Sequence, residues 1–155
     1  MADQLALSDF LDRYKPYAAV LLRLAFGFHL IYFTQDNVFS YVRMLEFRDF
    51  LEVRGVPFPL VGAIVSVAVQ FLCGIFLIVG WQVRVAGFFI LVNFILAFLI
   101  AHRGQSYEQF FQPVQLMAVG VFFLLHGAGA LSLDHYLHQR RTDRATPVPK
   151  RQASF

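Results

Sequence analysis

Long apolar stretches separated by short charged segments dominate the hydropathy pattern of this chain. Four of them approach the length of a membrane span, for which about 17 to 25 apolar residues are needed. We expect spans at Tyr17–Phe33, Pro59–Trp81 and Val85–Ala101, and a fourth that begins near Phe111. Lipid offers backbone N–H and C=O groups no partners, so each span must be a helix. The pattern therefore predicts an all-α fold, a four-transmembrane-helix bundle.

The segments outside the spans predict smaller elements. Residues 37–54 mix apolar and charged side chains, which is typical of an amphipathic interfacial helix between spans one and two. The connection between spans two and three is so short that these two helices must form an antiparallel hairpin. Pro16 and Pro113 are expected in the first turns of spans one and four, where proline costs little.

Three regions follow from this pattern. Residues 1–16 are expected to form an N-terminal interfacial segment, and residues 17–137 the four-helix membrane domain. Residues 138–155 are basic and polar with several prolines, and we expect no fixed structure in this tail.

Composition supports a lipid environment. Apolar residues make up 58% of the chain and charged residues only 15%, against about a quarter charged in soluble domains. The net charge of +3 arises largely from a basic tail beside a membrane span, not from a basic face interleaved with aromatic residues. We therefore expect membrane lipids, and no nucleic acid, as partners.

The distribution of Lys and Arg predicts the orientation. Eight lie on the side of the two termini and four on the opposite side, with Arg23 left out because it falls within a span. The positive-inside rule then places both termini in the cytoplasm of a multi-pass protein of the cell's inner (plasma) membrane.

Polar groups inside the membrane are costly and mark candidate functional positions. The candidate intramembrane polar site comprises Arg23, Gln70, Asn93, Gln115 and His126. Gln70 and Asn93 fall at mid-span on adjacent helices, so an amide–amide hydrogen bond between them is expected. That bond would either join the two helices only or belong to a ligand site.

Arg23 and His126 are predicted to share one polar layer. A rise of 1.5 Å per residue places them roughly 4 and 8 Å to the cytoplasmic side of mid-span. Such a layer suits an anionic or oxygen-rich head group, such as a quinone, a lipid phosphate or a small acid. The alternative is that Arg23 extends to the interface. Both interpretations stay open at this point.

The sequence offers no intrinsic metal or redox centre. Cys73 is a single cysteine, so neither an internal disulfide nor a CxxC pair is available. His29 and His126 fall at different depths and form a poor pair for haem iron. No trio of residues supplies a structural zinc site.

Several short motifs occur in a characteristic order and resemble those of the DoxX family of small four-helix bacterial membrane proteins. They are Leu22-Arg23-Leu24 with Gly27, Gly55-Val56-Pro57-Phe58-Pro59, Gly74 to Gly80 with Arg84-Val85-Ala86, and the string from His126 to Asp134. The resemblance covers residues 17–137. In physical terms, glycines allow a sharp bend at the exit of the last span, and Ser132 can cap a short helix containing Asp134.

The resemblance implies a link to membrane redox chemistry. Some family members are similar to a membrane subunit of thiosulfate:quinone oxidoreductase, and others are linked to membrane-bound redox complexes. The chain departs from the family at two places: Gln70 stands where many members carry Glu, and residues 33–37 lack a Gly-x-x-Lys. Glutamine cannot titrate, which argues against a proton-coupled role.

Two functional hypotheses remain. The first is a quinone-interacting subunit of a membrane redox complex, in which quinone is the cofactor and a partner protein carries the redox centre. The alternative is a non-enzymatic membrane protein that binds a lipid, small molecule or partner protein in assembly or stress tolerance. The sequence leaves open whether the chain catalyses a reaction and whether it forms a homo-oligomer. A transporter is less favoured because no inverted repeat is evident.

Overall fold

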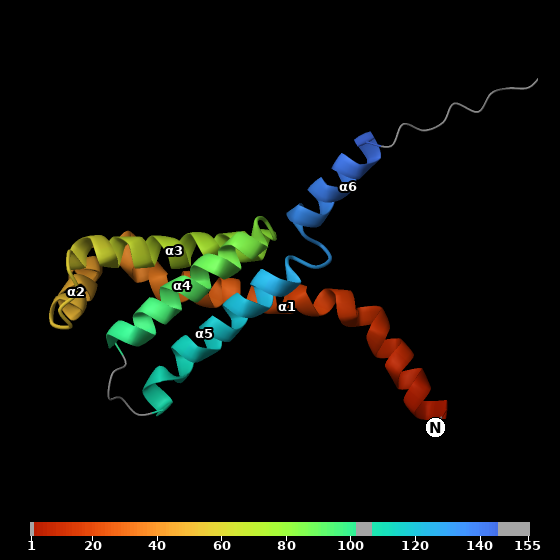
Figure 1. The fold of residues 1–155 in the computed structure, drawn as a ribbon, viewed down its shortest axis with the longest axis horizontal. Helices are drawn as coiled ribbons and strands as arrows, with labels where there is room; N and C mark the ends of the chain where they lie inside the picture. Colours follow the sequence, from red (N-terminus) through yellow and green to blue (C-terminus); the bar gives the residue numbers. More distant parts are fainter. Residues whose placement is uncertain (1, 102–106, 146–155) are drawn as a thin grey trace, which may run out of the picture.

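The computed structural model describes residues 2–101 and 107–145, and every element in these ranges is a helix (Figure 1). The order is α1 (Ala2–Phe39), α2 (Tyr41–Glu52), α3 (Pro59–Val79), α4 (Val83–Ala101), α5 (Tyr107–His126) and α6 (Leu133–Ala145). The predicted all-α architecture, with four apolar helices and a short helix between the first two, is confirmed.

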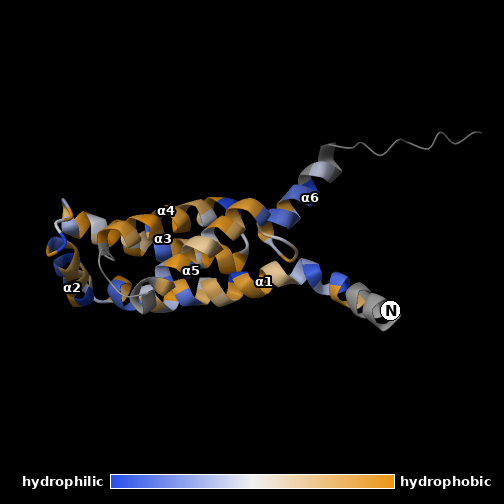
Figure 2. Cartoon of the chain, turned by 60° about the horizontal axis from the view of Figure 1, so that its bottom comes forward, coloured by the Kyte–Doolittle hydropathy of each residue, from blue (hydrophilic) through white to orange (hydrophobic). Residues whose placement is uncertain are grey.

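The four apolar helices form the membrane domain. In α1, α3 and α4, the segments Phe10–Phe39, Pro59–Val79 and Val83–Ile100 are long and apolar enough to cross a bilayer. The apolar part of α5, Phe111–His126, is shorter. However, the whole of α5 has 20 residues, which corresponds to about 30 Å of helix, the thickness of the hydrocarbon core. Figure 2 shows hydrophobic residues along these helices and hydrophilic residues along α6.

Both prolines lie inside helices, not in the first turns where we expected them. Pro16 stands within α1, and Pro113 follows the start of α5 at Tyr107 by six residues. Hydropathy locates where apolar residues begin, whereas both helices extend further into polar sequence. A proline removes one backbone hydrogen bond from a helix and favours a bend. Figure 1 shows the N-terminal part of α1 bent away from the bundle.

Two glycine contacts join the apolar helices in pairs. Gly27 of α1 faces Gly74 of α3, where a Cβ atom added to Gly74 would lie 2.9 Å from the Gly27 carbonyl oxygen. Gly87 of α4 faces Gly120 of α5 in the same way. A Cβ atom added to Gly120 would lie 2.9 Å from the Gly87 carbonyl oxygen. Small residues let helix backbones approach closely in lipid. The pairs α1–α3 and α4–α5 are therefore held by backbone contact.

The helix α2 lies across one end of this bundle (Figure 1). The Ser40 hydroxyl accepts a hydrogen bond from the Arg43 backbone N–H at 3.5 Å and caps its first turn. Leu51 is buried and lies 3.5 Å from a Cβ built on Gly62 of α3. Gly55, with a φ of 72°, reverses the chain before α3 begins.

The helix α6 extends into the region where we expected no fixed structure. It continues through residues 138–145, while residues 146–155 lie outside the described part of the chain. Its Leu, Gln and Arg residues have favourable helix propensities, and Ser132 supplies a cap. Basic composition alone did not distinguish this helix from a tail.

We predict that Gly120→Leu weakens the membrane domain because the new side chain would meet the backbone of Gly87 and Leu91. The expected loss is about 2–3 kcal/mol in the free energy of unfolding, as for overpacked cores. Denaturant unfolding in detergent, followed by circular dichroism, measures it. Ala118→Leu on the exposed face of the same helix is the control. Equal losses in the two variants would contradict a close α4–α5 contact.

Candidate functional site

Among the residues that the structure describes, the most buried charge is the guanidinium group of Arg23. Arg23 lies in the membrane-spanning part of α1, and only 1% of its surface is exposed. Its Nη1 donates to the Ala128 carbonyl oxygen at 2.8 Å, and its Nη2 donates to the Leu131 oxygen at 2.8 Å. Both acceptors belong to the linker between α5 and α6, residues 127–132. Backbone carbonyls therefore hold the charge inside the protein.

The linker takes its shape from glycine and serine. Gly127 and Gly129 have φ angles of 79° and 68°, a left-handed conformation that glycine adopts without strain. The Ser132 hydroxyl donates to the Gly129 oxygen at 2.9 Å and accepts from the His135 N–H at 3.1 Å. The predicted bend at the exit of α5 and the predicted Ser132 cap are both confirmed.

Asp134 connects the same linker to the hairpin of α3 and α4. Its carboxylate oxygens accept the backbone N–H groups of Gln82 at 2.9 Å and Val83 at 3.1 Å, at the beginning of α4. Its own N–H donates to the Gly80 oxygen at 3.0 Å. A carboxylate in this position caps the helix and offsets the positive end of its dipole.

Gly80 completes this arrangement because no larger residue fits beside Arg23. A Cβ atom on Gly80 would lie 2.5 Å from Arg23 Nη1 and 2.7 Å from Ser132 Cβ. We call Arg23, Gly80, Ala128, Leu131 and Asp134 the arginine clasp. It ties together α1, the α3–α4 turn and the entry to α6.

Arg23 and His126, which the sequence predicted to share one polar layer, have different partners in the structure. Arg23 is buried, and both of its terminal nitrogens have acceptors in the linker at the end of the bundle. His126 is exposed, stacks on Phe122 at a ring distance of 5.0 Å, and places Nδ1 3.4 Å from the Gly127 oxygen. No described contact joins the two side chains.

The expected amide pair is also absent from the described residues. Gln70 Nε2 donates to the Ser66 hydroxyl at 3.1 Å, one turn earlier on its own helix. Asn93 Nδ2 is buried and has no described acceptor. Gln115 is exposed on α5. The candidate residues are therefore distributed over separate parts of the bundle.

Asn93 lines an apolar cavity between α2, α3 and α4, which we call the Asn93 cavity. Its volume is about 260 Å³. Its only polar side chains are Ser66 and Asn93, and Asn93 lies near the middle of α4. The other lining residues are Phe47, Phe50, Leu51, Val56, Gly62, Val65, Leu96, Ala97 and Ile100. The sequence predicted Asn93 as a candidate site residue but did not predict the α2 residues of this cavity. The mixed apolar and charged pattern of α2 predicts a helix on the membrane surface.

Gln70 faces a different cleft, of about 430 Å³, between α1, α2 and α3. Phe47 and Phe50 line both this cleft and the Asn93 cavity. At its edge, Arg43 donates to Glu46 at 2.8 Å, and this hydrogen bond raises the pKa of Arg43 above its usual value. The aromatic side chains of α2 thus stand between the two spaces.

Four apolar helices fastened by a buried arginine define a small helical membrane protein. The family model described as DoxX matches residues 18–103, more than half of the chain, and the protein belongs to the DoxX family. The match includes Arg23 and Asn93 but ends before the string from His126 to Asp134. No curated protein and no solved structure matched the chain.

We predict that Arg23→Met destabilises the clasp, because the carbonyl groups of Ala128 and Leu131 lose their donors. The expected loss is about 3 kcal/mol in the free energy of unfolding in detergent. Hydrogen exchange at residues 127–134 should rise in parallel, since the linker is no longer held. Arg43→Met, at an exposed position, is the control and should leave that exchange unchanged. Unaltered exchange in Arg23→Met would exclude the clasp.

Proposed function

We propose that this protein binds a quinone in the Asn93 cavity and serves as a subunit of a membrane redox complex. The observation that carries the proposal is that Asn93 lines an apolar cavity while its buried Nδ2 has no acceptor among the described residues. A buried N–H group without an acceptor costs about 1–3 kcal/mol. A bound molecule that offers an acceptor recovers this cost.

A quinone head group suits the chemistry of these residues. It is a flat, largely apolar ring with carbonyl acceptors, and Phe47, Phe50 and the aliphatic side chains offer surfaces for it. A half-turn of the Asn93 amide exchanges Oδ1 and Nδ2, so the side chain can present a donor to a carbonyl or an acceptor to a hydroxyl. Asn93 could therefore bind both the oxidised and the reduced form.

The size of the cavity argues for a head group alone. Pockets that enclose drug-sized ligands are about 300–1,000 Å³, and the Asn93 cavity is slightly smaller, at about 260 Å³. Val65 and Leu96, at its lining, are 55% and 52% exposed. A prenyl tail would leave the cavity past these residues and lie in the lipid.

Electron transfer then requires a partner protein. A quinone, when bound, supplies two-electron and two-proton redox chemistry. This chain contributes binding and orientation, because Cys73 is its one cysteine and the four predicted spans contain no Asp or Glu. The redox centre and the proton path would belong to the partner.

We predict that Asn93→Leu weakens quinone binding by at least about tenfold, the effect of one lost hydrogen bond in an apolar site. A short-tailed quinone titrated into the detergent-solubilised protein measures the affinity, and chromatography of extracts measures the quinone that co-purifies. Gln115→Leu removes an exposed amide outside the cavity and serves as the control. Equal affinities for the quinone and a ring without carbonyl groups would favour a general lipid-binding role.

The proposal includes an orientation with both termini in the cytoplasm of the bacterial inner membrane. Arg84 and the arginines of α6 lie at one end of the bundle, which supports it. We predict that a fluorescent protein fused after Phe155 fluoresces in cells and that a periplasmic phosphatase fused there is inactive. The opposite pair of results would invert the topology.

A further inference from the structure

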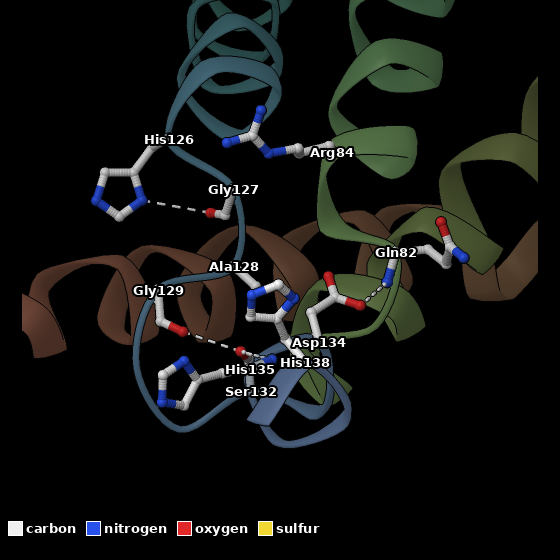
Figure 3. A pocket seen from close by; sticks show the side chains of 10 residues that line it. All are labelled: Gln82, Arg84, His126, Gly127, Ala128, Gly129, Ser132, Asp134, His135 and His138. Carbon is white, nitrogen blue, oxygen red and sulfur yellow. Dashed lines mark hydrogen bonds between the residues drawn. The ribbon is translucent and has the colours of Figure 1, made fainter. Parts of the chain in front are cut away.

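A second cavity, unrelated to the Asn93 cavity, lies at the opposite end of the bundle beside the arginine clasp (Figure 3). Its volume is about 610 Å³, and it is bordered by the start of α4, the end of α5, the linker and α6. We call it the linker cavity. Its lining residues are Gln82, Arg84, His126, Gly127, Ala128, Gly129, Ser132, Asp134, His135 and His138.

The guanidinium group of Arg84 has no ion-pair partner among the described residues of this cavity. Arg84 reaches toward Gly127, where its Nε lies 3.1 Å from a Cβ built on that glycine, and it has no described acceptor. The single carboxylate of the lining, Asp134, is already engaged by the N–H groups of Gln82 and Val83. The fork of N–H donors on Arg84 therefore remains available to an anion.

Histidines on α6 add further donors. His135 Nε2 lies 2.9 Å from Gln139 Nε2, one turn further along α6. The ring of His138 has no described partner. It lines the cavity together with Asp134 and Ala128 (Figure 3). Arg84 and His138 thus approach the linker from two different helices.

The position of the cavity matches the boundary between lipid and water. Trp81 directly precedes Gln82, and tryptophan is enriched at the level of lipid head groups. Figure 2 shows the hydrophobic residues of the bundle helices giving way to hydrophilic residues where α6 begins. An anion can therefore reach the cavity either from the lipid head-group layer or from the adjoining water.

We infer that the linker cavity binds a phosphate group, held by Arg84 and His138. A phosphate presents several acceptor oxygens with at least one negative charge, which suits the planar fork of an arginine together with N–H donors from a second direction. The phosphate can belong to a lipid head group or be free in solution, since the same oxygens would be bound in both cases.

Trp81 is the single tryptophan of the chain and can report on binding. The intact protein in a non-ionic detergent is titrated with inorganic phosphate, with chloride as the ionic-strength control. In parallel arms, the micelles receive phosphatidic acid or phosphatidylcholine. We expect a saturable change in Trp81 fluorescence with phosphatidic acid or inorganic phosphate, and the arm that saturates identifies the source. No saturable change in either arm would overturn the inference.

Two substitutions and a matched control test the assignment. Arg84→Gln and His138→Gln should each raise the midpoint of the titration, Arg84→Gln by about tenfold, as expected for loss of a charged hydrogen bond. Arg140→Gln removes the same charge on α6, outside the cavity, where Arg140 stacks over Tyr136. Its midpoint should change less than about twofold. Equal shifts in Arg84→Gln and Arg140→Gln would reduce the effect to general electrostatic attraction. If Arg84→Gln does not fold, an unshifted midpoint in His138→Gln overturns the assignment.

Discussion

A guanidinium group inside a membrane domain needs acceptors that lipid cannot supply, and Arg23 finds them in the carbonyl groups of Ala128 and Leu131. These acceptors are available only because Gly127 and Gly129 turn the linker back toward α1. The returning chain also carries Asp134 to the beginning of α4. One buried charge thus explains the bend after α5 and the packing of Gly80. The same bend places the linker beside Arg84 and so creates the linker cavity.

The sequence predicted much of the fold because lipid imposes simple rules. The four spans, the short helix after the first and the cap at Ser132 all follow from apolar length and local turn chemistry. The acceptors of Arg23 could not be predicted in this way. Every residue carries a carbonyl group, so no side-chain pattern marks the two that turn inward. Hydropathy likewise could not locate Pro16 inside a helix, since α1 continues into polar sequence.

The candidate site was predicted in part, and the error is informative. Position along a helix predicts depth in the membrane, and on that basis the sequence predicted Gln70 and Asn93 to be level. It does not give the direction in which each side chain points around its helix axis. Gln70 faces α1 and α2 and bonds Ser66, whereas Asn93 lines a separate cavity. The contribution of α2 was missed because hydropathy does not show which helix it covers.

The Asn93 cavity follows from how the helices pair. Gly27–Gly74 and Gly87–Gly120 draw α1 to α3 and α4 to α5, so the hairpin of α3 and α4 opens away from its turn at Trp81 (Figure 1). Phe47, Phe50 and Leu51 of α2 cover the resulting gap without filling it. The polar amide of Asn93 lies where the two helix pairs separate. The Asn93 cavity, with its one unpaired amide nitrogen, is thus a consequence of the close glycine contacts elsewhere, and the aromatic side chains of α2 form one of its walls.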